Sequence, residues 1–340
     1  MKFRFLFITI LVVAFFLLNI MIGTISIPIS EVMDVLFASG ENATQVSQNI
    51  ILKSRLPQAA TALAAGAGLA ISGLQMQTIF HNPLASPSVL GISNGASLGV
   101  ALVVLLSGSI GGVALSSLGL AGNALLIVSA VVGSLSVMML ILAISQKVKG
   151  NATLLIIGVM VGYVATAIIG VLKYFSNEED IRAYVVWGLG SFSRVSAGQV
   201  WLFVCIMAAL VPISMLLIKT MNILLLGDKY AQNLGLNISH ARVSVISCSG
   251  VMVAIVTAYC GPIMFLGLAV PHLCRALWRT NDNRVLMPAT VLTGSALALV
   301  CNLIARMPGF EGALPVNSVT ALIGAPIVAS VLFHHKTDLV

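Results

Sequence analysis

The chain has 340 residues, of which 59% are hydrophobic and only 8% are charged, and its mean hydropathy is +1.08. A soluble core does not need that much apolar content, so the composition excludes an ordinary soluble domain and indicates a polytopic membrane protein. The 17 Lys and Arg residues exceed the 10 Asp and Glu residues. Membrane topology accounts for this excess, because cytoplasmic loops are rich in Lys and Arg. The positive charge therefore does not indicate nucleic-acid binding.

About 20 apolar residues cross the hydrocarbon layer as a helix, so the chain has room for roughly ten crossings after loops. The first apolar run follows Lys2 and Arg4 and lacks a small-x-small cleavage site before Gly23. It is therefore predicted to be an uncleaved helix and not a secretory signal. The predicted spans, in chain order, are 5–23, 56–80, 95–110, 121–144, 154–172, 199–218, 243–259, 263–273, 286–305 and 319–333.

The eighth of these spans is short and is bracketed by Pro262 and Pro271. Pro271 is expected to break the helix, because proline lacks the backbone donor that a helix interior needs. His272 is then expected to act as a structural hydrogen-bonding residue at the inner surface, next to Arg275. If this segment did not cross, the basic residues around 275–284 would lie outside.

The distribution of basic residues predicts the orientation, because cytoplasmic loops are enriched in Lys and Arg. With the N-terminus inside and alternating spans, eleven of the 17 basic residues fall inside. The prediction is therefore a membrane protein with an even number of spans and both termini in the cytoplasm. The inside residues are Lys2, Arg4, Lys147, Lys149, Lys219, Lys229, Arg242, Arg275, Arg279, Arg284 and Lys336.

Several kinds of chemistry find no support in the sequence. No predicted span carries a charge near its middle, which argues against an ion-coupled carrier. There is no GxxxxGK[ST] loop to hold a nucleotide, so any ATP would bind a partner. No cofactor, metal site or disulfide framework is expected, because the cysteines follow no CxxC spacing and lie in apolar segments at Cys205, Cys248, Cys260, Cys274 and Cys301.

The second predicted span carries two rows of small residues at a spacing of four. This spacing lets helix backbones approach closely in a membrane, and it predicts a tightly packed central helix; a substrate-lining role is the alternative. The rows are Ala60, Ala64, Gly68 and Ser72, and Ala62, Gly66 and Ala70.

The segment 81–99, HNPLASPSVLGISNGASLG, interrupts the helical pattern with Pro83 and Pro87. No regular helix can run through both prolines, and irregular backbone at membrane depth is tolerated only inside protein or beside a watery cavity. The segment is either a pathway element or a plain cytoplasmic turn, and the residues leave both open. His81 is expected to be a turn residue. The polar candidates for a lining are Asn82, Ser86, Ser88, Ser93 and Asn94.

The segment 224–242, LLLGDKYAQNLGLNISHAR, is the most polar interruption inside the apolar chain. Asp228 is expected to cap a short helix through its side chain, Gly235 to close that helix, and Ser239 to cap the next one. In the short helix Ala231 and Leu234 are expected to form one apolar face with Tyr230. The sequence favours a docking surface for a soluble partner over a helix lying on the lipid surface, which would show a longer apolar face and more basic flanks.

Four separated motifs resemble one family. They are RLPQAATALAAGAGLAISGLQMQTIFHNPLASPSVLGISNGASLG, LGDKYAQNLGLNISHAR, GPIMFLGLAVPHLCR and LPVNSVTALIGAPI, and the resemblance covers residues 55–333. In order and spacing they are similar to the permease subunits of ABC importers for iron chelates and cobalamin. This resemblance implies an all-α polytopic type II ABC importer permease, with ten spans per subunit. It also implies a homodimer in a bacterial plasma membrane, with two ATPase subunits below and an external binding protein, periplasmic or lipid-anchored, above.

The resemblance also implies roles for individual residues. The loop 219–242 would hold the coupling helices, and residues that would seat in a cleft of the ATPase are Gly227, Asp228, Lys229, Ala231, Leu234 and Gly235. On the outer face Arg55 and Arg306 would meet acidic residues of the binding protein. Gln58 stands where relatives frequently carry another arginine, and Lys53 would compensate. The inner gate would involve Asn82, Leu84 and Asn151 to Thr153.

The sequence therefore predicts a single transmembrane permease domain over 1–340 that imports a bulky metal chelate, such as a siderophore complex, haem or cobalamin. It predicts no catalytic role, since no acid, base and nucleophile converge. The alternatives are a self-sufficient carrier or channel, which would transport without an ATPase, and an exporter permease, which would need no external binding protein.

Overall fold

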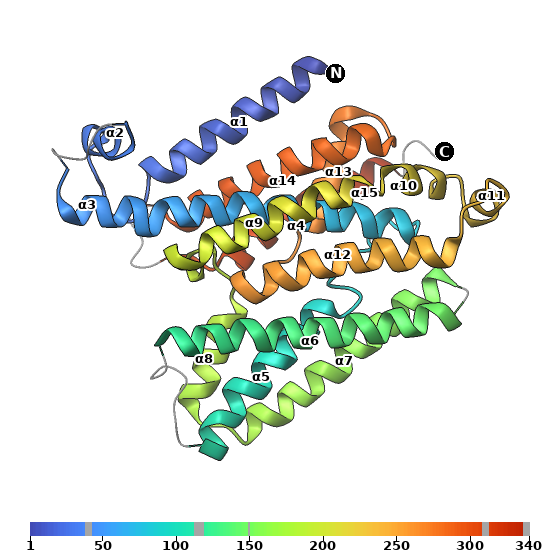
Figure 1. Cartoon of the computed structure of the whole chain (residues 1–340), viewed down its shortest axis with the longest axis horizontal. Coiled ribbons are helices and arrows are strands. Elements are labelled where there is room, and N and C mark those ends of the chain that lie inside the picture. Colours follow the sequence, from blue (N-terminus) through green and yellow to red (C-terminus); the bar gives the residue numbers. More distant parts are fainter. Residues whose placement is uncertain (38–42, 112–118, 149, 308–312, 336–340) are drawn as a thin grey trace.

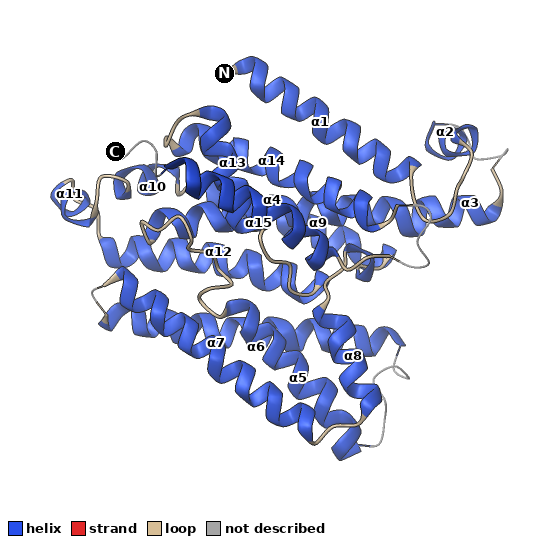
Figure 2. Cartoon of the chain, turned by 180° about the vertical axis from the view of Figure 1, so that it is seen from behind, coloured by secondary structure: helices blue, strands red, loops and turns tan. Residues whose placement is uncertain are grey.

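The computed structural model describes residues 1–37, 43–111, 119–148, 150–307 and 313–335, and within these residues the regular secondary structure is all helical, with no strand (Figure 1, Figure 2). The elements are α1 (Lys2–Met21), α2 (Ile29–Phe37), α3 (Gln45–Ile50), the π-helical turn η1 (Ile51–Arg55), α4 (Leu56–Ile79), α5 (Ile92–Gly111), α6 (Gly119–Lys147), α7 (Asn151–Tyr174), α8 (Glu178–Gly188), the 3-10 turn η3 (Phe192–Arg194), α9 (Ala197–Met215), α10 (Ile218–Leu224), α11 (Asp228–Asn233), α12 (Ile238–Cys260), α13 (Leu266–Trp278), α14 (Asn283–Ala305) and α15 (Val316–His335).

Each of the ten predicted spans falls on a helix. By length and composition, seven helical segments of the described chain are long and apolar enough to cross a membrane: α1, the continuous run Gln45–Ile79, α6, α7, α9, α12 and α14. The apolar parts of α5 and α15 are shorter, and α13 has only 13 residues. The prediction of an all-α polytopic membrane protein is confirmed.

The helices form layers that run along the long axis of the molecule. In both views α5, α6, α7 and α8 lie together on one side, α12 lies next to them, and α4, α9, α13 and α14 follow, with α1 on the opposite edge (Figure 1, Figure 2). The start of α1 and the end of α15 lie at the same end of the molecule as α10 and α11, whereas α2 and α3 lie at the other end (Figure 1). We call these the α11 end and the α3 end.

Helix α4 is the central helix, as its small residues predict. It is buried over most of its length and packs on α9, α12, α13 and α14. At Gly66 an added methyl carbon would lie 2.3 Å from the carbonyl oxygen of Gly294 in α14, and at Gly73 it would lie 1.7 Å from the carbonyl oxygen of Gly267 in α13. The glycines therefore bring α4 into direct backbone contact with both neighbours, so the close-packing prediction is confirmed.

The prediction that Pro271 breaks the eighth span is wrong. Pro271 lies inside α13, and the helix continues for seven more residues to Trp278. Proline removes the hydrogen bond to the carbonyl of Gly267, but that carbonyl lies against Gly73 of α4, and Gln77 Nε2 donates to the neighbouring carbonyl of Leu268 at 3.3 Å. Neighbouring groups thus support the backbone that proline leaves open, which is how membrane helices tolerate it.

The irregular segment predicted between the second and third spans is present. Helix α4 ends at Ile79 and α5 begins at Ile92. Between them Ala85, Ser86 and Leu90 are buried, whereas His81, Pro83 and Leu84 are exposed, so the segment is packed on the protein at its second half and open at its start.

Candidate functional site

The candidate site begins at α11, a helix of six residues that projects at one end of the molecule (Figure 1). Two glycines define its ends, Gly227 with φ 91° and Gly235 with φ 85°. Neither has a neighbouring atom that an added methyl group would meet, so the backbone conformation alone requires glycine there. Gly235 donates to the carbonyl of Gln232 at 2.9 Å and Leu236 to that of Ala231 at 3.0 Å. This is a Schellman closure, which confirms the predicted C-cap.

The predicted N-caps are wrong at both helices. Asp228 is the first residue of α11 and makes no capping bond with its side chain, because its carboxylate binds elsewhere. Ser239 lies inside α12, whose cap is Asn237, and the Asn237 side chain accepts from His240 N at 3.1 Å.

The predicted apolar face of α11 is divided between two sides. Ala231 is fully buried against the body of the protein, so it fixes the helix and does not reach a partner. Leu226, Tyr230 and Leu234 are 58%, 62% and 57% exposed. Leu225, at the end of α10, is exposed to a smaller degree, at 40%. We call the three most exposed apolar side chains of this projection, Leu226, Tyr230 and Leu234, the α11 knob.

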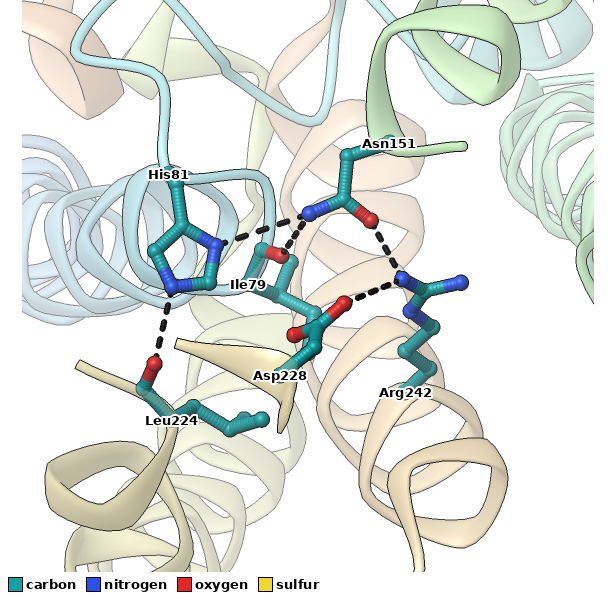
Figure 3. Close-up of polar contacts among 6 residues, drawn as sticks. All are labelled: Ile79, His81, Asn151, Leu224, Asp228 and Arg242. Atoms are coloured by element: carbon teal, nitrogen blue, oxygen red, sulfur yellow. Dashed lines mark hydrogen bonds and ion pairs between the residues drawn. The ribbon is translucent and has the colours of Figure 1, made fainter. Parts of the chain in front are cut away.

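A polar network joins α11 to the N-terminal ends of α12 and α7 (Figure 3). Arg242, in the first turn and a half of α12, donates through Nη2 to Asp228 Oδ2 at 2.9 Å, forming an ion pair. The same nitrogen donates to Asn151 Oδ1 at 2.6 Å. One guanidinium thus holds both the first residue of α11 and the first residue of α7, and charge-assisted bonds of this kind are the stronger ones.

The network continues to the turn after α4 (Figure 3). Asn151 Nδ2 donates to the carbonyl of Ile79 at 3.1 Å and lies 3.5 Å from His81 Nδ1. On the other side of the ring, His81 Nε2 lies 2.8 Å from the carbonyl of Leu224 at the end of α10. With its proton on Nε2, His81 donates to Leu224 and can accept from Asn151. We call Ile79, His81, Asn151, Leu224, Asp228 and Arg242 the junction network.

The other predicted gate residues lie beside this network but take no part in its bonds. Asn82 Oδ1 accepts from Leu84 N at 2.9 Å, which forms a tight local turn and leaves the Leu84 side chain 47% exposed. Thr153 is exposed on α7. From the other side, His272 Nε2 lies 2.8 Å from the carbonyl of Pro83, so His272 is the structural hydrogen-bonding residue that the sequence predicts.

At the α3 end, Arg55 is buried, with 2% of its surface exposed. Its Nη1 donates to the carbonyls of Ile20 and Met21 at 2.9 and 2.7 Å, and its Nη2 donates to that of Ile25. Arg55 thus ties the start of α4 to the chain that leaves α1.

Arg306, which directly follows α14, binds the same region at the end of α1. It is 8% exposed, donates to Gln58 Oε1 at 2.6 Å and to the carbonyls of Asn19 and Ile22 at 3.3 and 3.1 Å. Burial and the positive charge of Arg55 lower the pKa of Arg306 to about 10, so it stays protonated at neutral pH. Both arginines have structural partners here, and their docking role stays a prediction. Lys53, by contrast, is exposed.

Three contributors are not predicted from the sequence. Arg242 is indicated only as one of the inside basic residues. Asn19 and Asn302 bond to each other at 2.8 Å between α1 and α14, and the signal that could indicate these two is an amide side chain inside an apolar helix. Among the described residues, no three His, Cys, Asp or Glu side chains lie close enough to hold a metal ion.

Comparison with known proteins decides the family. Residues 10–334 match the model of the FecCD transport family. The chain belongs to this family. Its FecCD relatives include the vitamin B12 import system permease protein BtuC of Escherichia coli O17:K52:H18, 35% identical over 291 residues that cover 85% of each chain, and that of Citrobacter koseri, 35% identical over 86% of each.

The fold of this FecCD protein also matches a solved structure. The match is to an inward-facing conformation of a metal-chelate type ABC transporter, with 29% sequence identity and a TM-score of 0.83 over 98% of this chain and all of the other. The architecture is therefore that of an ABC transporter permease.

Proposed function

We propose that this chain is the permease subunit of an ATP-binding-cassette importer that moves a bulky metal chelate, such as an iron siderophore, haem or cobalamin, into the cytoplasm. Membership of the FecCD family and relatives named as vitamin B12 import permeases support transport of this class of cargo. The observation that carries the mechanism is the junction network, because it links an exposed projection to the ends of two membrane helices.

The proposed assembly contains two copies of this chain, two ATPase subunits and an external binding protein. Each copy is proposed to be one transmembrane domain over 1–340 that crosses the membrane ten times, with the coupling loop at 219–242 in the cytoplasm. The start of α1 and the end of α15 lie at the α11 end, which supports an even number of crossings with both termini cytoplasmic (Figure 1).

The chain itself is proposed to be non-catalytic and to bind no cofactor, with ATP and Mg²⁺ held by the partner ATPase. Its long apolar helices offer few charges for holding a bare cation, since desolvating an ion without partners is costly. A large and partly apolar chelate suits such a pathway better.

The proposed coupling step starts at the α11 knob. The ATPase binds Leu226, Tyr230 and Leu234, while Gly227, Lys229 and Gly235 shape the contact. When ATP-driven closure of the ATPase moves α11, Asp228 moves with it. Arg242 then passes the displacement to Asn151 at the start of α7, and His81 passes it to the turn that carries Asn82 and Leu84, the proposed inner gate.

Charge reversal at Asp228 tests this step in proteoliposomes that contain the complete transporter. Asp228→Lys places two positive charges together in the junction network, and we expect uptake to fall about tenfold, the equivalent of about 1.4 kcal/mol, while ATP hydrolysis continues. The matched control is Arg284→Glu, an exposed charge reversal at the same end and outside the network, which should leave uptake unchanged. Normal uptake in Asp228→Lys would contradict the proposal.

Reconstitution without the ATPase separates the importer from its rivals. Transport by the purified chain alone would establish a carrier or channel and contradict the proposed ATP-driven mechanism. Uptake that needs the binding protein would exclude an exporter permease.

For docking of the binding protein, we propose that Arg55 and Arg306 supply a fixed positive field and that the exposed Lys53 makes the accessible contact. Lys53→Glu should weaken docking more at low salt than at high salt, because salt screens exposed charges. An equal loss of affinity at both salt concentrations would contradict an electrostatic role for Lys53.

A further inference from the structure

A large groove lies at the α11 end between α1, α13 and α14, away from the junction network. Its volume is about 650 Å³, within the range of about 300–1,000 Å³ typical of ligand sites. The walls are almost entirely apolar, with side chains from all three helices. They include Phe7, Ile8, Leu11, Phe15, Leu273, Leu297 and Val300.

Two arginines line the groove together with these apolar residues. Arg4 and Arg279 are both exposed. Arg4 Nη1 donates to the carbonyl of Leu277 at 2.7 Å, which places its guanidinium beside the end of α13 and leaves its other donors available. Arg279 ends α13 in a left-handed conformation, with φ 51°. The groove thus combines a long apolar wall with two positive charges.

The third feature of the groove is a tryptophan, Trp278, whose indole N–H has no acceptor among the described residues. Trp278 lines the groove and is 4% exposed. Its ring packs on Phe5 of α1, with the ring centroids 5.4 Å apart. Buried donors in folded proteins are nearly always paired, so this indole in the groove wall needs an acceptor that the described residues do not supply.

We infer that this groove binds an anionic phospholipid of the leaflet at the α11 end. One acyl chain lies along the apolar wall between α1 and α14, and the phosphate lies near Arg4 and Arg279. An ester or phosphate oxygen accepts from Trp278 Nε1. A basic pocket between membrane helices on the cytoplasmic side is the form in which proteins recognise anionic headgroups, and tryptophan is typical of this depth. The inference needs membrane insertion but does not depend on the cargo or on the ATPase.

Lipid retention tests this site directly. The purified transporter is equilibrated with vesicles of equal parts phosphatidylglycerol and phosphatidylcholine, re-extracted, and weighed intact by native mass spectrometry. We expect phosphatidylglycerol to be retained preferentially, and Arg4→Gln with Arg279→Gln to lower its retention about 25-fold, because each of the two basic residues near an anionic surface contributes about a factor of five.

Two further variants probe the groove without changing charge. Ala296→Phe fills the apolar wall and should abolish retention although both arginines remain. Trp278→Phe removes only the indole donor and should lower retention to a smaller degree. The matched control, Lys147→Gln with Arg284→Gln, removes two exposed charges at the same end but outside the groove and should retain lipid like the parent protein.

Three results would overturn the inference. The first is equal retention of phosphatidylcholine and phosphatidylglycerol by the parent protein. The second is unchanged retention in the double arginine variant. The third is efficient disulfide cross-linking of Phe7→Cys between two copies of the chain, which would assign the groove to a contact between subunits.

Discussion

The two ends of the molecule hold buried arginines by different kinds of partner. At the α11 end, Arg242 binds the side chains of Asp228 and Asn151, which belong to two other helices. At the α3 end, Arg55 and Arg306 donate mainly to main-chain carbonyls of the chain that leaves α1. Side-chain partners can exchange when helices move, whereas main-chain carbonyls cannot turn without unfolding the segment. The α3 end is therefore built as an anchor and the α11 end as a joint.

The largest expected effect lies in the anchor. Arg306→Ala would leave Gln58 and the carbonyls of Asn19 and Ile22 without their donor, at a cost of about 5 kcal/mol of unfolding free energy, since each of the three bonds to a charged group contributes about 1.5–3 kcal/mol. Thermal unfolding in detergent measures this loss. Arg182→Ala, which removes an exposed arginine, is the control, and an equal loss in both variants would remove the distinction between anchor and surface.

Substitutions in the joint at the α11 end should lower the uptake rate more than the free energy of unfolding. Arg242→Gln and Asn151→Ala each break the bond between α12 and α7, and we expect each to lower uptake about tenfold. Because the two changes share this bond, although each also removes a bond of its own, the loss in the double variant should be smaller than the product of the two single losses. Uptake rates of the four proteins form the measurement, and losses that simply multiply would show that the two residues act separately.

A smaller effect is expected from the geometry of α11. Gly235→Ala adds a methyl group where φ is 85°, at a cost of about 1 kcal/mol, and should loosen the end of α11 without touching the body of the protein. Hydrogen exchange of α11 amides measures this. Gly198→Ala, also in open space but in the ordinary helix α9, is the matched control and should show no loosening.

The smallest effect is a pH dependence at the start of α14. Hydrogen bonds from the backbone N–H of Arg284 and from the side chain of Asn222 hold the pKa of Asp282 below its usual value. A carboxyl group with a lowered pKa stabilises the fold above its unfolded pKa and loses that contribution as pH falls through the folded pKa. The melting temperature of the parent protein should therefore fall more between pH 5 and pH 3 than that of Asp282→Asn. Equal falls would contradict the assignment.

The sequence predicted the features that follow from local pattern. Apolar runs located the ten helices that the predicted spans fall on, the small residues of α4 indicated its central place, and Gly235 indicated the end of α11. In each case the determining residues are neighbours along the chain, so periodicity or backbone preference is sufficient.

The features that it missed depend on residues far apart in the chain. Asn151 and Arg242 are separated by 91 positions, and only the packed helices bring them together. Asp228 was expected to bind the amides next to it, but a guanidinium 14 residues later competes successfully for its carboxylate. Pro271 was expected to end a helix, but α4 packs against this part of α13 and Gln77 donates to the carbonyl of Leu268, which is a property of tertiary packing.

The glycine contacts of α4 have a mechanical consequence. Where Gly66 meets Gly294 and Gly73 meets Gly267, main chains touch without intervening side chains, so neither α13 nor α14 can slide along α4 by rotating a few torsions. These three helices should move as one rigid unit. The movement that opens a passage is then expected in α5, α6 and α7. Spin labels on α4 and α14 should keep their separation through the ATP cycle, while the distance from α4 to α7 changes.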